Sequence, residues 1–192
     1  MLTVIIGGSG SGKSEYAENY LLQRHLLQQK SQISQEKRLG KKELERNNNL
    51  IYIATMQPFG KEAEQKIKRH QLMRQEKNFT TIECYTGLAG VSLPDKAYVL
   101  LECMSNLVAN EMFSEQGARE HTLAEVLKGI DKLSHQAAEL MVVTNNVFED
   151  GYNYDRSTME YLRILGEINV GISRRADQVI EVVHGIPIVL KK

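Results

Sequence analysis

The chain has 192 residues, of which 42% are hydrophobic and 25% charged, and its formal net charge is zero. This balance predicts one globular domain with a sizeable core. It does not indicate bulk electrostatic attraction to nucleic acid or to an anionic membrane, and it leaves a local basic patch open. Cys84 and Cys103 each lie beside an apolar run, which favours buried free thiols over a disulfide framework. No apolar run is long enough for a membrane span and no secretory signal precedes the first strand, so we expect a cytoplasmic protein.

The first apolar run, residues 2–6, leads directly into a glycine-rich stretch and then into a helix-like segment. The stretch consists of Gly7, Gly8, Ser9, Gly10, Ser11, Gly12, Lys13 and Ser14. This order of strand, glycine-rich turn and Gly-Lys-Ser is the context that a phosphate-binding P-loop requires. Glycine amides can surround phosphate oxygens, Lys13 can reach the outer phosphates, and the Ser14 hydroxyl can ligate Mg²⁺. The alternative is a turn that only links two elements, but the preceding strand favours a nucleotide site.

Beyond this stretch, residues 14–27 carry apolar side chains near helical spacing and predict an amphipathic helix. Residues 28–49 are rich in Gln, Lys, Glu and Asn and form a polar insertion, either a mobile loop or an exposed helical extension. Residues 50–54 are nearly all apolar, as expected of a strand buried on both faces of a parallel sheet. Because ligands of open α/β sheets bind beyond such strand ends, we expect the following loop, residues 55–60, near the P-loop.

The segment 61–77 is the second candidate for chemistry. Ala63, Ile67, His70 and Arg74 are spaced by four, three and four residues, so a helix would place them along one stripe. Neutral imidazole beside guanidinium suits attack on phosphorus, because arginine neutralises phosphate oxygens while histidine supplies the nucleophilic nitrogen. A histidine in a charged helix is also often an ordinary surface residue, and the spacing alone leaves both interpretations open.

Two further strands are expected at residues 80–84 and 98–102, and the second ends in Glu102. A carboxylate at the end of a buried strand downstream of a P-loop is what the Walker-B role requires, since it can hold Mg²⁺ or its water shell. The alternative is an incidental acid at a strand end. We therefore treat Ser14 and Glu102 as candidate metal ligands.

The rest of the chain alternates helices with strands. The expected elements are helices over 106–113, 123–140 and 157–177, a strand over 140–144 and a terminal hairpin over 178–183 and 186–190. In the last helix, Ser157 or Thr158 is the expected N-cap and Met159 is expected to face the core. The chain therefore predicts a single nucleotide-binding domain over residues 1–192. Its fold class is α/β of the P-loop (RecA-like) three-layer type, with a mostly parallel sheet and a C-terminal antiparallel hairpin.

These motifs together resemble the bifunctional adenosylcobinamide kinase / adenosylcobinamide-phosphate guanylyltransferase family of cobalamin biosynthesis. The resemblance runs nearly end to end, apart from the 28–49 insertion. The P-loop is similar to the family's opening block, and Ile67 to Arg74 looks like its Ile-x-x-His-x-x-x-Arg segment. Leu101-Glu102-Cys103 is similar to its acidic block, and Val143-Thr144-Asn145 to the block that follows.

The resemblance implies that His70 attacks the α-phosphorus of GTP and that GMP is then transferred to adenosylcobinamide phosphate. It also implies a kinase that phosphorylates adenosylcobinamide from ATP or GTP, a corrinoid as the small-molecule substrate, and a homotrimer. The catalytic residues would be His70, Lys13 and Arg74, with Glu102 also near the nucleotide. The positions similar to the family's guanine-nucleotide contacts are Thr55, Met56, Gln57, Gln71, Leu72, Met73, Arg74 and Glu83.

Three alternatives stay open from the sequence. Gly10 stands where the family usually has Arg and Phe79 replaces a common Trp, while the histidine segment is spared, so a member with guanylyltransferase activity alone is one alternative. The second is a P-loop kinase for another small hydroxyl substrate, with His70 structural. The third is a non-catalytic nucleotide switch that binds a partner protein.

Overall fold

The computed structural model describes residues 1–38, 49–58, 60–61, 65, 67–68, 71–72, 77–148, 151–152 and 154–192. The described strands are β1 (Leu2–Gly7), β2 (Leu50–Ala54), β3 (Thr80–Glu83), β4 (Tyr98–Leu101), β5 (Glu139–Asn145), β6 (Gln178–Val183) and β7 (Ile186–Lys191). The helices are α1 (Lys13–Arg38), α3 (Met104–Phe113), α4 (Thr122–Gln136) and α5 (Arg156–Arg175), with the short 3₁₀ turns η1 (Leu88–Gly90) and η2 (Arg119–His121).

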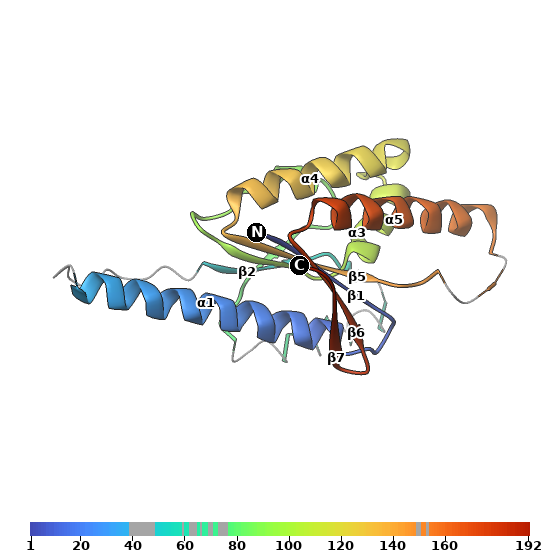
Figure 1. Ribbon diagram of the computed structural model, residues 1–192. Helices are drawn as coiled ribbons and strands as arrows, with labels where there is room; N and C mark the ends of the chain where they lie inside the picture. Colours follow the sequence, from blue (N-terminus) through green and yellow to red (C-terminus); the bar gives the residue numbers. More distant parts are fainter. Residues whose placement is uncertain are drawn as a thin grey trace.

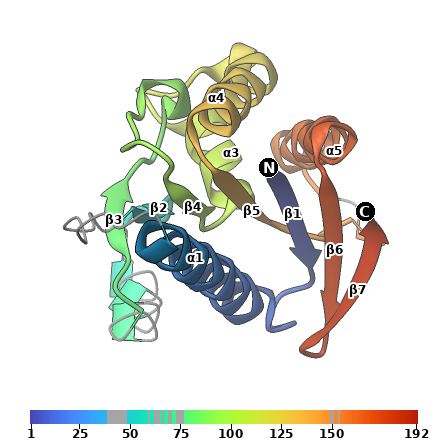
Figure 2. The ribbon, with the colours of Figure 1, turned by 60° about the vertical axis from the view of Figure 1, so that its left-hand side comes forward.

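These strands form one sheet in the order β3-β2-β4-β5-β1-β6-β7. Neighbouring strands are parallel from β3 to β6, and only β7 runs antiparallel, against β6. Helix α1 covers one face of the sheet, whereas α3, α4 and α5 cover the other (Figures 1 and 2). The three-layer α/β fold with a parallel sheet and a C-terminal hairpin is therefore confirmed.

The central strands are buried on both faces, which explains their unbroken apolar runs. On β5, Leu140 and Val142 join the core beneath α3, α4 and α5, whereas Met141 and Val143 join the core beneath α1. Fully burying one such side chain contributes about 1.5–3 kcal/mol. A slip of one residue would exchange the side chains of the two cores, so the register depends on how each side chain fits its own core and not on an apolar–polar alternation.

Several predicted helix boundaries need correction. Helix α1 continues to Arg38, so residues 28–38 of the polar insertion are a helical extension, and residues 39–48 lie outside the described residues. Helix α4 ends at Gln136, because Ala137 is already extended and leads into β5. The helical prediction for residues 137–140 was therefore wrong.

The start of α5 also differs from the prediction. Its N-cap is Asp155, not Ser157 or Thr158, because the Asp155 carboxylate accepts hydrogen bonds from the backbone amides of both residues, at 2.8 and 3.1 Å. Met159 is 49% exposed, because the buried face of α5 begins only at Ile164. The N-terminal turn of this helix thus depends on Asp155.

We expect Asp155→Ala to lower the melting temperature by a few degrees at neutral pH, through loss of the cap. Hydrogen bonds from Ser157 and Thr158 hold the pKa of Asp155 well below its ordinary value of 3.8. The stabilisation is therefore complete above that ordinary value and is lost as pH falls towards the folded-state pKa. The difference in melting temperature between wild type and Asp155→Ala should be smaller at pH 3 than at pH 7. Asp155→Asn is the matched control, because asparagine can still cap the helix but carries no charge. An equal gap at both pH values would contradict this account.

Candidate nucleotide-binding site

The glycine-rich stretch connects β1 to α1 at the carboxyl edge of the sheet. Gly10 and Gly12 have φ values of +72° and +86°, a conformation that favours glycine. At Gly7, an added Cβ would lie 2.6 Å from both Ser11 Oγ and the carbonyl oxygen of Val182. The tight turn therefore ends at the N-terminus of α1, where unpaired amides and the positive end of the helix dipole favour an anion.

Lys13 lies over this loop. Its Nζ donates to the carbonyl oxygen of Gly8 at 3.0 Å, and the residue is 9% exposed. Burial lowers the pKa of Lys13, and the neighbouring Cys103 offsets part of that effect. A desolvated ammonium gains strongly from an incoming phosphate, because the charge then acquires a partner in a low-dielectric environment.

The C-terminal hairpin supports the loop from the other side. The amide of Gly185 donates to the carbonyl oxygen of Ser11 at 2.8 Å, and a Cβ on Gly12 would lie 3.3 Å from the Gly185 Cα. His184 and Gly185 form the turn with φ values of +50° and +79°. The sequence predicted this two-residue turn. It did not predict that the turn would lie against the glycine-rich loop, a contact that follows from the pairing of β6 with β1.

Glu102 follows β4, and β5 separates β4 from β1. β4 therefore lies about 10 Å from β1 across the sheet, given two strand spacings of about 4.8 Å. Glu102 is 7% exposed, and its Oε2 accepts a hydrogen bond from the backbone amide of Thr55 at 3.3 Å. The loop after β2 thus holds the carboxylate at the edge where a nucleotide would bind.

Thr55 is fully buried, and its amide, hydroxyl and carbonyl groups all make hydrogen bonds within the protein. Its hydroxyl donates to the carbonyl oxygen of Cys103 at 2.9 Å, and its own carbonyl oxygen accepts from Asn110 Nδ2 at 2.9 Å. Thr55 therefore joins the loop after β2 to α3 and the residue that precedes it. Thr55 thus positions the loop, and its direct contact with a nucleotide stays a prediction.

Asn145 was not singled out as a site residue from the sequence. It ends β5, pairs in register with Gly7, and donates from Nδ2 to Ser105 Oγ at 3.0 Å. The next amide, that of Asn146, donates to the carbonyl oxygen of Gly7 at 3.1 Å. Asn145 therefore lies between the P-loop strand and the Glu102 strand. The same rule that identified Glu102, a polar residue directly after a buried strand, could have identified it.

A small cavity of about 140 Å³ lies next to Glu102. Three of the predicted nucleotide contacts, Met56, Gln71 and Glu83, line it together with Glu102. Two other predicted contacts lie elsewhere: Gln57 lines a larger groove, and Leu72 is 70% exposed.

His70, Met73 and Arg74 lie outside the described residues, as does Ala63 of the predicted stripe. The described residues between 60 and 72 are helical, and Ile67 lines the small cavity. The chain is anchored just after this segment, where Lys77 Nζ lies 2.8 Å from Oε2 of the buried Glu18 on α1. The described part of the segment thus borders the small cavity that Glu102 also lines.

The donor chemistry fits a magnesium ion bound together with phosphate. Within the described ranges, no cluster of three or more His, Cys, Asp or Glu side chains could hold a metal by itself. Mg²⁺ prefers one or two protein oxygens with phosphates and water, which Ser14 and Glu102 can supply. In the same part of the chain, no helix has the length and apolarity to cross a bilayer.

A glycine-rich loop at a helix N-terminus, a buried lysine and a strand-end carboxylate define a P-loop nucleotide-binding protein of the α/β class. The sequence matches the family model for cobinamide kinase / cobinamide phosphate guanyltransferase, CobU, over residues 3–190. The chain belongs to this family, as its motifs predicted.

Two curated relatives are 27% identical to this chain, and each alignment covers all of both proteins. They are the bifunctional adenosylcobalamin biosynthesis proteins CobU of Escherichia coli, over 205 residues, and Salmonella typhimurium, over 206 residues. Among solved structures, a KaiC-like protein from Pyrococcus horikoshii is similar with a TM-score of 0.45 and 10% identity, covering 94% of this chain and 71% of that one.

Proposed function

We propose that this enzyme guanylylates adenosylcobinamide phosphate through a GMP–histidine intermediate on His70, and that it also phosphorylates adenosylcobinamide. One observation carries the proposal: a single family match spans both the P-loop and the Ile67 to Arg74 segment. The described helical residues of that segment border a cavity shared with Glu102, which supports a nucleotide near it.

In the first half-reaction, an imidazole nitrogen of His70 attacks the α-phosphorus of GTP. A phosphorus–nitrogen bond forms, the bond from the α-phosphorus to the α–β bridging oxygen breaks, and pyrophosphate leaves. In the second, a phosphate oxygen of adenosylcobinamide phosphate attacks the same phosphorus. The phosphorus–nitrogen bond then breaks, its electron pair returns to the imidazole, and the product carries a diphosphate bridge between GMP and the corrinoid.

The side chains around the phosphates stabilise charge. The P-loop amides and Lys13 would bind the β- and γ-phosphates, and Arg74 would neutralise oxygens on the α-phosphorus. Mg²⁺, held by Ser14 and Glu102 with water, would further neutralise the triphosphate. We assign guanine recognition to the cavity lined by Met56, Gln71 and Glu83 because it borders the histidine segment.

The kinase reaction uses the same P-loop. The adenosylcobinamide hydroxyl attacks the γ-phosphorus of ATP or GTP, the bond to the β–γ bridging oxygen breaks, and the nucleoside diphosphate leaves while the hydroxyl proton is released.

Because ATP and GTP are cytoplasmic nucleotides, we place the enzyme in the cytoplasm, and we retain the homotrimer as a prediction. Sedimentation equilibrium measures the assembly, and a monomer at micromolar concentration would contradict it.

Incubation with GTP labelled at the α-phosphate tests the proposal. We expect label on the protein that is acid-labile and base-stable, as a phosphoramidate is, and that chases onto adenosylcobinamide phosphate. A simple kinase would instead transfer γ-label to a small acceptor and leave the protein unlabelled. A nucleotide switch would do neither, and would show only nucleotide-dependent affinity for a partner.

A further inference from the structure

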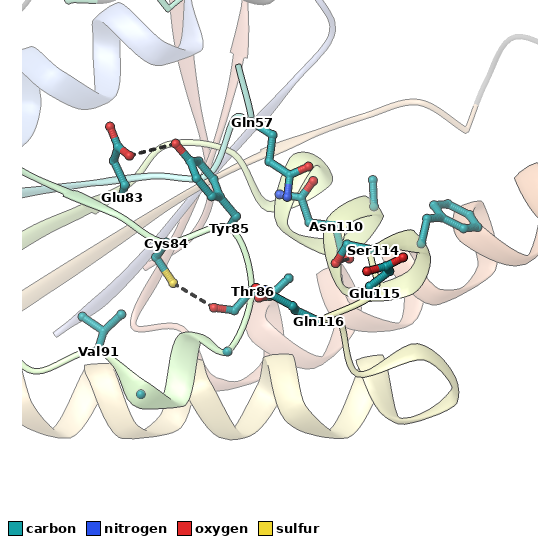
Figure 3. Close-up of a pocket in the computed structure, with 14 residues that line it drawn as sticks. Gln57, Glu83, Cys84, Tyr85, Thr86, Val91, Asn110, Ser114, Glu115 and Gln116 are labelled. Atoms are coloured by element: carbon teal, nitrogen blue, oxygen red, sulfur yellow. Dashed lines mark hydrogen bonds between the residues drawn. The ribbon is translucent and has the colours of Figure 1, made fainter. Parts of the chain in front are cut away.

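A groove of about 1010 Å³ opens beyond the carboxyl end of β3. One wall is the loop that follows β3, and the other is the last turn of α3 with the residues after it (Figure 3). Its volume is at the upper end of the range for small-molecule sites, about 300–1,000 Å³. The groove therefore suits a ligand larger than a nucleotide base.

A buried carboxylate fixes the two walls relative to each other. Glu111 is 2% exposed, and its two oxygens accept from the backbone amides of Gly87, at 2.7 Å, and Ala118, at 2.9 Å. Gly117 is needed at the turn, because a Cβ there would clash with the carbonyl oxygen of Glu111. The shape of the groove is thus set by the fold.

The lining chemistry disfavours a phosphate-rich ligand. The described lining residues include no Lys, Arg or His, and they include the carboxylates of Glu83 and Glu115. They also supply the side-chain amides of Gln57, Asn110 and Gln116 and one exposed aromatic ring, Phe113, at 59% exposure. In Figure 3 the amides of Gln57 and Asn110 lie beside each other.

These groups complement a cobalt(III) corrin. Such a macrocycle is broad and flat, its rim carries carboxamides, and its metal centre contributes positive charge. Carboxamides pair with side-chain amides, the ring edge packs on an aromatic side chain, and carboxylates favour the positive charge.

The groove adjoins the proposed nucleotide site. Glu83 and Tyr85 line both the groove and the small cavity that contains Gln71 and Glu102, and Tyr85 donates to Glu83 Oε2 at 2.9 Å. We propose that this groove binds the corrinoid acceptor of the guanylyl transfer, with its phosphate directed past Tyr85 towards the histidine segment. This inference rests on the proposed function.

Two variants alter the groove without touching its buried supports. Phe113→Ala removes the exposed ring, and Ala109→Phe, on the α3 wall, fills the space. We expect each to raise the KM for adenosylcobinamide phosphate about tenfold or more, with histidine guanylylation from GTP unchanged because that half-reaction needs no corrinoid. Phe148→Ala is the matched control, since Phe148 is 42% exposed and does not line this groove.

Equilibrium dialysis with adenosylcobinamide phosphate, followed by corrin absorbance, measures binding independently of turnover. Weaker binding by both groove variants, with Phe148→Ala unchanged, would support the site. Normal binding and normal KM in both groove variants would overturn it. If wild type forms no guanylyl intermediate, the proposed reaction fails, and the dialysis comparison still decides whether the groove holds the corrinoid.

Discussion

Replacing His70 by alanine is expected to abolish incorporation of α-phosphate label from GTP and to lower guanylyl transfer by about a thousandfold or more. The reason is that no other group would provide the nitrogen on which GMP is held between the two half-reactions. The measurement is acid-labile, base-stable label on the protein, quantified together with the rate of chase onto adenosylcobinamide phosphate. Phosphorylation of adenosylcobinamide should persist in this variant, because the P-loop is intact.

His121→Ala is the control for this experiment. His121 belongs to η2 and is a surface histidine, with a side chain that is 76% exposed. The His121→Ala variant should acquire the α-phosphate label and transfer GMP as the wild type does. Label that survives in His70→Ala with the same acid and base stability would assign the intermediate to another residue and would contradict the proposed mechanism.

Lys13→Met is expected to lower kcat/KM for both the kinase and the guanylylation reactions by about a hundredfold to a thousandfold. Methionine keeps the approximate volume and the unbranched chain but removes the ammonium that would bind the outer phosphates. Because burial already lowers the pKa of Lys13, removing its charge also removes a desolvation cost, so the folded protein should stay at least as stable. Steady-state kinetics with both substrates and a thermal melt measure these effects.

Lys128→Met is the matched control, because Lys128 is exposed on α4 and pairs only with Glu125 at 3.1 Å among the described ion pairs. Comparing Lys13→Met with His70→Ala also separates the two activities. The histidine variant should lose only guanylyl transfer, whereas the lysine variant should lose both. A lysine variant that retains full kinase activity would mean that the glycine-rich loop does not bind the phosphoryl donor.

Much of the fold followed from local patterns. The strands that are buried on both faces have continuous apolar runs, and short runs of this kind bounded by turns are typical of buried parallel strands. Helix ends were less predictable. Asp155 competes with Ser157 and Thr158 for the same cap, and only the backbone path before α5 decides among them.

The candidate site divides in the same way. The P-loop and Glu102 could be predicted, because each is defined by a short motif next to a strand. The same strand-end rule could have identified Asn145, but its place between β1 and β4 depends on strand order, which the rule does not give. His70 and Arg74 lie outside the described residues, and their roles stay predictions.

The sequence by itself determined the nucleotide-binding loop, the parallel strands and the family, because each depends on residues close together in the chain or on a pattern along its whole length. Only the tertiary structure decided that the hairpin turn at Gly185 supports Ser11, that Glu111 joins two loops into one groove, and that this groove meets the cavity beside Glu102. These contacts join segments that are distant in sequence. Their partners follow from the order of strands in the sheet, which no local spacing specifies.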